Sequence, residues 1–484
     1  MSLQKTSIKR NFFMNALLTM SGFIFPLITF PYISRVLMPA GTGKINFATS
    51  VINYFSMFAQ LGIPVYGIRA CAKVRDNREE LTRTAHELLF INLIMSVISY
   101  IALAVALMII PKFQSEKPLI VLISLTIVLS SVGMEWLYKA LEQYSYITIR
   151  SLVFKAIAII AMFVLVHTES DYLIYGGITI FAASASNILN LINAHKYIGF
   201  RSVGNYNLRR HFKSVIVFFA MACATTVYTN LDNVMLGFMT TEEDVGLYGA
   251  AVKIKTVLIT IVTSLGTVLL PRASYYIECG KIEEFKRITA KALNFVMLLA
   301  MPLTIYFILY AKQCILFLSG DLYYGSIVPM QIIMPTLLLI GITNVLGIQI
   351  LIPTGREKTV LYSEIVGAVV DMVINALLIP RMKSAGAAIG TLIAELAVLI
   401  VQYFALRKEI GYAFKQIEYW KIAFGILIGT TLSFGTLRFG WGNFLSLLIS
   451  AILFYGSYAL FLLITKERMM LELFTQIILK KRKQ

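Results

Sequence analysis

The sequence predicts an all-α protein that crosses a membrane many times. Of its 484 residues, 58% are hydrophobic and 14% are charged, whereas a soluble globular chain has roughly 45–50% apolar and about 25% charged residues. The apolar residues gather into runs of about 20, the length that an α-helix needs to cross the hydrocarbon core of a bilayer. Most runs lack the alternation of polar and apolar residues that a half-exposed element of a soluble fold requires.

We expect about fourteen transmembrane helices, separated by segments rich in proline and glycine. The first run follows Lys5, Lys9 and Arg10 and is too long for a signal-peptide core, so we interpret it as a helix that stays in place. The expected spans are 12–34, 45–68, 86–110, 118–138, 148–167, 173–195, 214–238, 246–270, 290–311, 327–352, 360–380, 385–405, 421–438 and 443–464.

The basic residues predict the orientation. With the N-terminus inside, 33 of the 43 Lys and Arg lie on the cytoplasmic side, 8 lie on the other side, and Lys253 and Lys255 fall inside a span. An excess of Lys and Arg in cytoplasmic loops is the usual pattern of membrane proteins. We therefore expect a membrane protein with both termini in the cytoplasm. The net charge of +18 then needs no nucleic-acid partner.

A weak internal repeat predicts two lobes. Residues 43–48 (GKINFA) and 246–251 (GLYGAA) open the second and eighth spans, about 203 residues apart. Spans one to six and seven to twelve are thus interpreted as two parallel six-helix lobes, related by a pseudo-two-fold axis along the membrane normal. The predicted domains are 1–196, 197–420, and 421–484, the last with two added helices and a basic cytoplasmic tail. Apolar helices can also resemble one another without any repeat.

Several chemistries have no support in the sequence. The four cysteines and four histidines are scattered without the spacing of a disulfide framework or a metal site. We expect no metal, no cofactor and no catalytic residues. The connections between spans are too short to hold an extramembrane domain with its own core.

Ionisable side chains within spans are the candidate functional residues, because such groups are costly in the bilayer and are usually paired or functional. Asp232 and Lys253 lie at similar depth on adjacent spans, where a salt bridge would either lock the hairpin or act as a gate. Lys255 faces about 200° away from Lys253 around the same helix. Asp371 and Glu395 also lie at similar depth, and two such acids could carry a proton or simply bind structural neighbours.

Three arginines are placed to meet an anion. Arg35 lies near the outer mouth of the first span, and Arg69 and Arg272 lie at the inner ends of the second and eighth. Ordinary anchoring at the cytoplasmic surface would explain Arg69 and Arg272 equally well.

Two blocks of the sequence resemble a known family. Residues 30–37 (FPYISRVL), 43–48, 61–64 (LGIP) and 66–69 (YGIR) are similar to the N-terminal signature of bacterial polysaccharide flippases. These proteins export O-antigen and capsule repeat units and belong to the multidrug/oligosaccharidyl-lipid/polysaccharide exporter superfamily. Residues 232–237 (DNVMLG), 245–248 (VGLY) and 270–272 (LPR) are similar to its second-half signature. The resemblance extends over essentially the whole chain.

The resemblance implies two six-helix lobes around a cationic cavity. It implies movement of an oligosaccharide on undecaprenyl pyrophosphate from the cytoplasmic to the outer leaflet by alternating access, often with ion coupling. Arg35, Arg69, Lys253 and Arg272 would then bind the pyrophosphate, and Lys255 is a further candidate that rests on its place within a span. Asp232, Asp371 and Glu395 would gate the cavity or couple an ion, although Asp371 and Glu395 lie outside the matched blocks.

The partners so implied are the lipid-linked oligosaccharide, membrane lipids, and the glycosyltransferases and polymerase of the same pathway. Two other functions stay open. A drug/cation antiporter of the same fold would need an acidic cavity. A membrane glycosyltransferase or polymerase would need paired carboxylates on a sizeable loop, which the sequence lacks.

Overall fold

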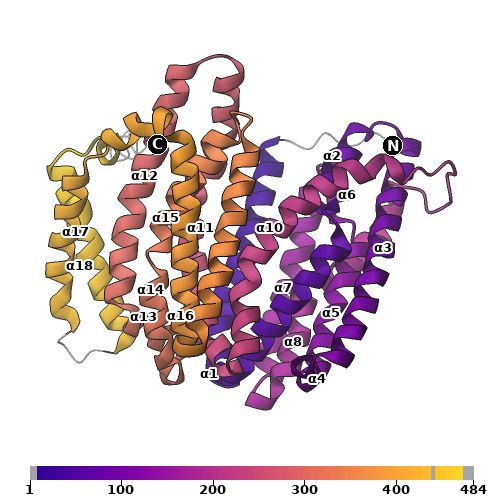
Figure 1. Ribbon diagram of the computed structural model, residues 1–484, viewed down its shortest axis with the longest axis horizontal. Coiled ribbons are helices and arrows are strands. Elements are labelled where there is room, and N and C mark those ends of the chain that lie inside the picture. Colours follow the sequence, from indigo (N-terminus) through magenta and orange to yellow (C-terminus); the bar gives the residue numbers. More distant parts are fainter. Residues whose placement is uncertain (1–7, 438–441, 473–484) are drawn as a thin grey trace. The chain divides into compact units, whose positions relative to one another are not determined.

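The structure, a computed structural model, describes residues 8–437 and 442–472 and consists of helices joined by short connections (Figure 1). It divides into two compact units, Met1–Gly246 and Leu247–Gln484. The N-terminal residue Lys5 and the basic tail from residue 473 onward, which support the prediction of cytoplasmic termini, lie outside the described residues. The same holds for Arg438, at the end of the predicted thirteenth span.

The first unit contains the N-terminal helices and α10. In chain order its elements are α1 (Ile8–Gln60), α2 (Ile63–Lys73), α3 (Arg78–Ile109), α4 (Pro111–Ser115), α5 (Lys117–Val132), α6 (Glu135–Ala140), α7 (Tyr144–Leu165), η1 (Glu169–Asp171), α8 (Tyr172–Ile180), the π-helical η2 (Phe181–Ala185), α9 (Asn187–Asn193), η3 (Ala194–Lys196) and α10 (Arg209–Met239). The boundary between the units falls inside the next helix, α11 (Glu242–Glu278).

The second unit contains most of α11 and all later elements. These are α12 (Ile282–Leu309), α13 (Ala311–Ser319), η4 (Asp321–Ser326), α14 (Ile327–Ile333), α15 (Thr336–Asn344), the π-helical η5 (Val345–Leu351), α16 (Glu357–Lys415), α17 (Tyr419–Phe434), η6 (Gly435–Leu437) and α18 (Asn443–Ile464). The predicted lobes 1–196, 197–420 and 421–484 were defined by a sequence repeat, whereas the two units are defined by contacts between residues. The lobes therefore stay a prediction.

The prediction of a polytopic helical membrane protein is confirmed. In the described residues, 11 helices are long and apolar enough to cross a membrane, or 12 when one bent pair counts as a span. The helix α1 has 53 residues and α16 has 59, and each contains a residue with non-helical backbone angles, Met38 and Lys383 respectively. Since about 20 residues cross a bilayer, each of these helices is long enough for two spans. The count of fourteen depends on dividing both, and it stays a prediction.

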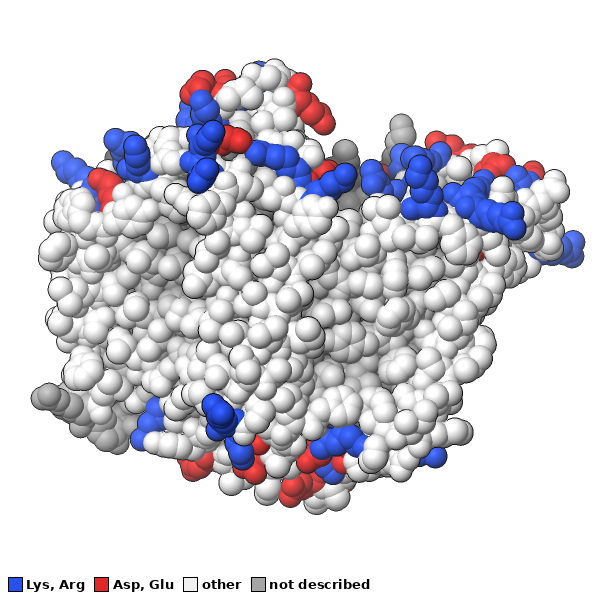
Figure 2. Space-filling model, viewed as in Figure 1, with Lys and Arg blue, Asp and Glu red and all other residues white. Residues whose placement is uncertain are grey.

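Charged side chains lie at the helix ends. Figure 2 shows, for each unit, a visible face that is uncharged along the middle of its helices, with Lys, Arg, Asp and Glu gathered at both ends. In the first unit, the basic side chains are denser at the end where α2 and α6 lie in Figure 1. A band without charge is what contact with hydrocarbon requires, because an ionised side chain there is costly.

A hydrophobic core joins α2, α3, α6 and the start of α10. Ile63, Cys71, Leu88 and Leu137 are fully buried in this core. Gly67 permits the close packing, because a Cβ there would lie 2.9 Å from the ring of Trp136. This core fixes the ends of the helices that enclose the cavity described below.

At the other end of the first unit, the break in α1 packs against the start of α11. A Cβ on Gly43 would collide with the carbonyl oxygen of Glu242, and a Cβ on Gly246 would collide with that of Pro39. Gly43 lies four residues after Pro39, and Gly246 lies four residues after Glu242. The contact between the two segments is therefore reciprocal. Only glycine allows such an approach of two backbones.

Two salt bridges lie beside this contact. The Nζ of Lys112 lies 2.5 Å from Oε1 of Glu242, and the Nζ of Lys44 lies 2.9 Å from Oε1 of Glu116. They tie α4 to α11 and α1 to the start of α5.

In the second unit, α17 and α18 pack against each other and against α12 and α13. Tyr306 of α12 and Tyr310, which directly follows that helix, are buried together with Phe454 of α18. The hydroxyl of Tyr306 lies 2.9 Å from the carbonyl oxygen of Leu447, and that of Tyr310 donates to the carbonyl of Ser433 at 2.7 Å. The last two helices are thus held to α12 by both apolar packing and hydrogen bonds.

Candidate functional site

A cavity of about 570 Å³, open on one side, lies in the first unit between the second half of α1, the start of α2 and the middle of α10. This volume is within the range of about 300–1,000 Å³ of small-molecule sites. Its lining consists of Asn53, Ser56, Met57, Gln60, Gly62, Pro64, Val65, Phe218, Met221, Ala222, Thr225, Thr226 and Asn230. Among the described residues, this lining contains amides, hydroxyls and apolar groups but no Asp, Glu, Lys or Arg.

Helical spacing brings these side chains to two facing walls. Asn53, Ser56 and Gln60 are three and four residues apart on α1 and therefore lie on one face of that helix. On α10, Phe218, Ala222 and Thr225 recur at the same spacing. The two faces turn toward each other because α1 and α10 pack side by side.

Hydrogen bonds orient the polar wall of the cavity. The Nδ2 of Asn53 donates to Oδ1 of Asn230 at 2.9 Å, which joins α1 to α10. Within α1, Nε2 of Gln60 donates to Oγ of Ser56 at 2.8 Å. An amide has two N–H donors and an oxygen with two lone pairs, so these bonds leave further hydrogen-bonding capacity in the wall.

The turn between α1 and α2 is shaped by glycine. Gly62 has a φ of 73°, a left-handed conformation that favours glycine. A Cβ at this position would also lie 2.5 Å from the backbone nitrogen of Phe219. The backbone of α10 thus fits directly against the turn, which closes this end of the cavity.

An aromatic ring and an arginine flank the cavity. Phe218 belongs to the lining, and the guanidinium carbon of Arg69 lies 5.7 Å from the centroid of its ring. This geometry is that of a cation–π interaction. Arg69 is exposed on α2. Of the arginines predicted to bind an anion, it is therefore the one beside this cavity.

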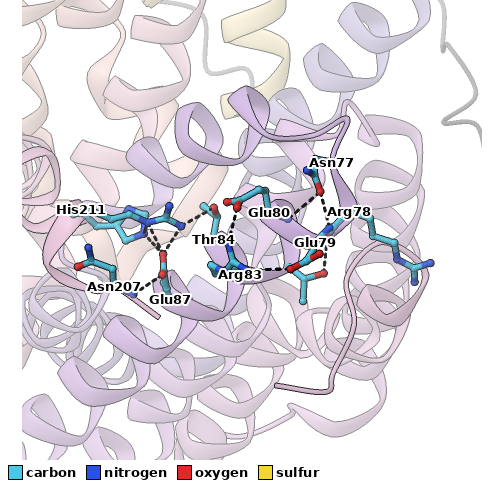
Figure 3. Close-up of polar contacts among 11 residues, drawn as sticks. Asn77, Arg78, Glu79, Glu80, Arg83, Thr84, Glu87, Asn207 and His211 are labelled. Atoms are coloured by element: carbon cyan, nitrogen blue, oxygen red, sulfur yellow. Dashed lines mark hydrogen bonds and ion pairs between the residues drawn. The ribbon is translucent and has the colours of Figure 1, made fainter. Parts of the chain in front are cut away.

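A buried carboxylate anchors the start of α10. Glu87 of α3, whose side chain is fully buried, accepts hydrogen bonds from the backbone N–H of Asn207 at 2.7 Å and from Nε of Arg210 at 2.8 Å. The Nε2 of His211 lies 2.7 Å from Glu87 Oε2, and its Nδ1 lies 2.9 Å from the hydroxyl of Tyr66 on α2. Figure 3 shows Glu87 pointing toward His211 and Asn207. This network holds α2, α3 and α10 together beside the cavity.

Sequence reasoning missed Glu87, Arg210 and His211. The signal was present, because Glu87 is an acid at the start of the predicted span 86–110, and a carboxylate there needs partners. Asn53, Gln60 and Asn230 were also missed. A single amide in an apolar helix carries no charge, so only their convergence in space marks them.

Two other predicted residues lie in the first unit, outside the lining of the cavity. Arg35 is exposed on the first half of α1, and its Nη1 donates to the carbonyl of Pro31 at 2.5 Å. Asp232 is buried on α10, two residues after Asn230. Lys253, the predicted partner of Asp232, belongs to the second unit, and their salt bridge stays a prediction.

The remaining predicted residues lie in the second unit. On α11, Lys253 and Lys255 are half-buried and Arg272 is exposed. Asp371 and Glu395 are buried in α16, on opposite sides of its break at Lys383. These five residues lie outside the lining of the cavity in the first unit.

The two halves of α16 face each other through polar groups. A Cβ on Gly390 would lie 3.0 Å from Oδ1 of Asp371, so the helix that carries Glu395 passes close to Asp371. Further along, Nε2 of Gln402 donates to Oγ of Ser363 at 3.0 Å. The structure thus places Asp371 and Glu395 on adjacent halves of one helix, whereas their role in ion coupling stays a prediction.

The fold is that of a polytopic helical membrane protein, and α1, α2 and α10 line an open pocket of mixed polar and apolar character. The family model described as "Polysaccharide biosynthesis protein" matches residues 8–277, which is more than half of the chain. The chain belongs to this family, and the predicted resemblance to polysaccharide flippases of the exporter superfamily is confirmed. A second family model, MatE, matches residues 218–377.

Two curated relatives carry the name "Putative O-antigen transporter". The one from Escherichia coli (strain K12) is 25% identical over 84% of this chain and 99% of its own length. The one from Shigella dysenteriae is 23% identical over 83% of this chain and 100% of its own length. The similarity therefore extends over the full length of both relatives.

Solved structures share the fold. The lipid II flippase MurJ in an inward closed conformation has a TM-score of 0.72 at 16% identity and covers 92% of this chain and 97% of its own. An inward-facing multidrug resistance transporter of the MATE family has a TM-score of 0.60 at 12% identity and covers 81% and 99%. At these identities the likeness concerns the fold alone.

Proposed function

We propose that the chain is a flippase that moves oligosaccharide repeat units, linked to undecaprenyl pyrophosphate, from the cytoplasmic to the outer leaflet. The observation that carries this proposal is the similarity to two proteins named as O-antigen transporters over 99% and 100% of their lengths. The family match over residues 8–277 supports it independently.

The physical task explains why a polar cavity and nearby cations are needed. A pyrophosphate with an attached glycan is too hydrophilic to enter hydrocarbon, because its charges and hydroxyls would lose their hydration. Side-chain amides and hydroxyls replace water around the glycan. Arginine and lysine replace the counterions of the pyrophosphate through charge-assisted hydrogen bonds.

Arg69 is the arginine best placed to bind the pyrophosphate, because it lies beside the ring of Phe218 at the cavity. Arg35, Lys253, Lys255 and Arg272 are further candidates for the same role. Asp232, Asp371 and Glu395 are the candidates for gating and for coupling to an ion gradient. Alternating access by the two lobes would expose the cavity to each side in turn.

The protein would act in the bacterial inner membrane with both termini in the cytoplasm. Its proposed partners are the lipid-linked oligosaccharide, membrane lipids, and the glycosyltransferases and polymerase of the same pathway, but not nucleic acid. It would carry out no chemistry on the sugar and need no cofactor.

A drug/cation antiporter is the second candidate. The MatE match over residues 218–377 and the MATE fold favour it. A cationic drug, however, needs acidic groups at its site, and the lining of the described cavity has none.

Reconstitution into liposomes tests the proposal. Fluorescent undecaprenyl-pyrophosphate oligosaccharide is incorporated, and a membrane-impermeant quencher reports the fraction in the outer leaflet, with and without a pH gradient. We expect transport by the wild type and at least a tenfold slower rate for Arg69→Ala, with Arg78→Ala, an exposed arginine of α3, as the control. Absence of transport, combined with export of a cationic dye, would instead establish the antiporter.

A further inference from the structure

We propose that the cavity between α1 and α10 binds an uncharged sugar residue of the glycan, and that Asn53, Gln60 and Asn230 select it. This inference rests on the proposed function and adds to it which part of the substrate this cavity accepts. It assigns the cavity to the glycan and leaves the pyrophosphate to cations outside the lining.

The polar side chains of the lining fit sugar hydroxyls. A hydroxyl both donates and accepts hydrogen bonds, and amide and hydroxyl side chains offer both kinds of partner. Six such side chains line the cavity, namely Asn53, Ser56, Gln60, Thr225, Thr226 and Asn230. A site built from them discriminates between sugars, because a bound sugar that lacks the matching hydroxyl covers one of these polar groups without giving it a partner.

The apolar part of the lining, which is the larger part, fits the C–H face of a pyranose ring. Met57, Val65, Met221 and Phe218 all contribute to it. A pyranose has hydroxyls around its edge and C–H groups on its faces, so it can be bound by polar groups and packed against apolar ones at once. The cavity provides both kinds of surface.

The lining rejects acidic sugars on electrostatic grounds. A carboxylate accepts hydrogen bonds but cannot donate them, and burial of a charge without a counterion is strongly unfavourable. The described lining offers no cation to a uronic acid. Arg69 lies outside the lining. Its described contact with a lining residue is the cation–π contact with the ring of Phe218. It is therefore placed for the pyrophosphate, next to the first sugar.

The test compares two substrates in proteoliposomes. One is undecaprenyl pyrophosphate with a neutral trisaccharide of hexoses, and the other has a glucuronate in place of the hexose next to the pyrophosphate. We expect the wild type to move the neutral substrate at least tenfold faster. Gln60→Leu, which removes the amide, should slow the neutral substrate at least fivefold. Gln60→Arg, which adds a cation, should move the ratio toward the acidic substrate.

Gln331→Leu, an exposed glutamine of α14, serves as the matched control and should retain the wild-type ratio. Equal wild-type rates for the two substrates would overturn the inference while the proposed function stands. Transport of neither substrate would overturn both. If a Gln60 variant does not fold, as judged by its melting temperature in detergent, the wild-type ratio alone decides.

Discussion

Single residues within the spans gain their meaning from the partners that surround them. The sequence placed Asp371 and Glu395 at similar depth, and the structure finds both buried in adjacent halves of α16. Depth along a helix can be counted from the turns, whereas the side that a residue faces depends on packing. For this reason the network around Glu87 and the amides of the cavity could not be predicted from the sequence.

Loss of the Glu87 carboxylate should destabilise the first unit. Glu87→Ala leaves the buried His211 and the backbone N–H of Asn207 without their acceptor, and each buried group left without a partner costs about 1–3 kcal/mol. We expect a clearly lower melting temperature in detergent. Glu79→Ala, on the same helix, is the control, because its side chain is 68% exposed and exposed pairs contribute about 0–1 kcal/mol. Equal melting temperatures would contradict the role of the network.

At the scale of whole elements, the sequence predicted the positions of breaks in helices. It did not predict that the helix resumes directly after the break. Proline and glycine near residues 39–43 and at Pro380 predicted two turns, and α1 and α16 indeed depart from helical geometry at Met38 and Lys383. Both helices resume at once, and Pro26 and Pro31 lie inside α1 without ending it. Neighbouring helices can satisfy backbone groups that a proline leaves unpaired, which a local pattern does not reveal.

The reciprocal glycine contact makes its own prediction. Gly43→Ala and Gly246→Ala would each force a Cβ into a carbonyl group, so we expect lower thermal stability and weaker transport for both. Gly22→Ala is the matched control, because its Cβ would meet nothing within 4 Å and alanine stabilises a helix by roughly 0.5–1 kcal/mol relative to glycine. Wild-type behaviour of both clashing variants in melting and transport assays would show that the two backbones do not approach this closely.

At the scale of the whole molecule, composition and charge were sufficient for the class of protein. Runs of apolar residues fixed the helical membrane architecture, and the matched signature blocks identified the family that the comparisons confirm. The lobes are harder to predict, because a sequence repeat reports common ancestry of two segments and does not show which helices pack together. The helix α10, assigned by the repeat to the second lobe, groups by contact with α1 and α2.

The predicted orientation can be tested with the native cysteines. Cys279 is exposed after α11, whereas Cys71 and Cys314 are buried. If the termini are cytoplasmic, a membrane-impermeant maleimide should label Cys279 in inside-out vesicles and not in intact cells. Ser170→Cys in a Cys279→Ser background, an exposed position in the predicted outer connection between residues 167 and 173, should show the reverse pattern. Labelling of Cys279 from outside would invert the topology.

The most direct test of the central claim is a cryo-EM structure of the full chain in nanodiscs with undecaprenyl pyrophosphate that carries a neutral trisaccharide. The account predicts density for a sugar ring between α1 and α10, within hydrogen-bond distance of Asn53, Gln60 or Asn230 and against Phe218, with the pyrophosphate toward Arg69. A bound substrate whose glycan lies elsewhere, with this cavity empty, would contradict it.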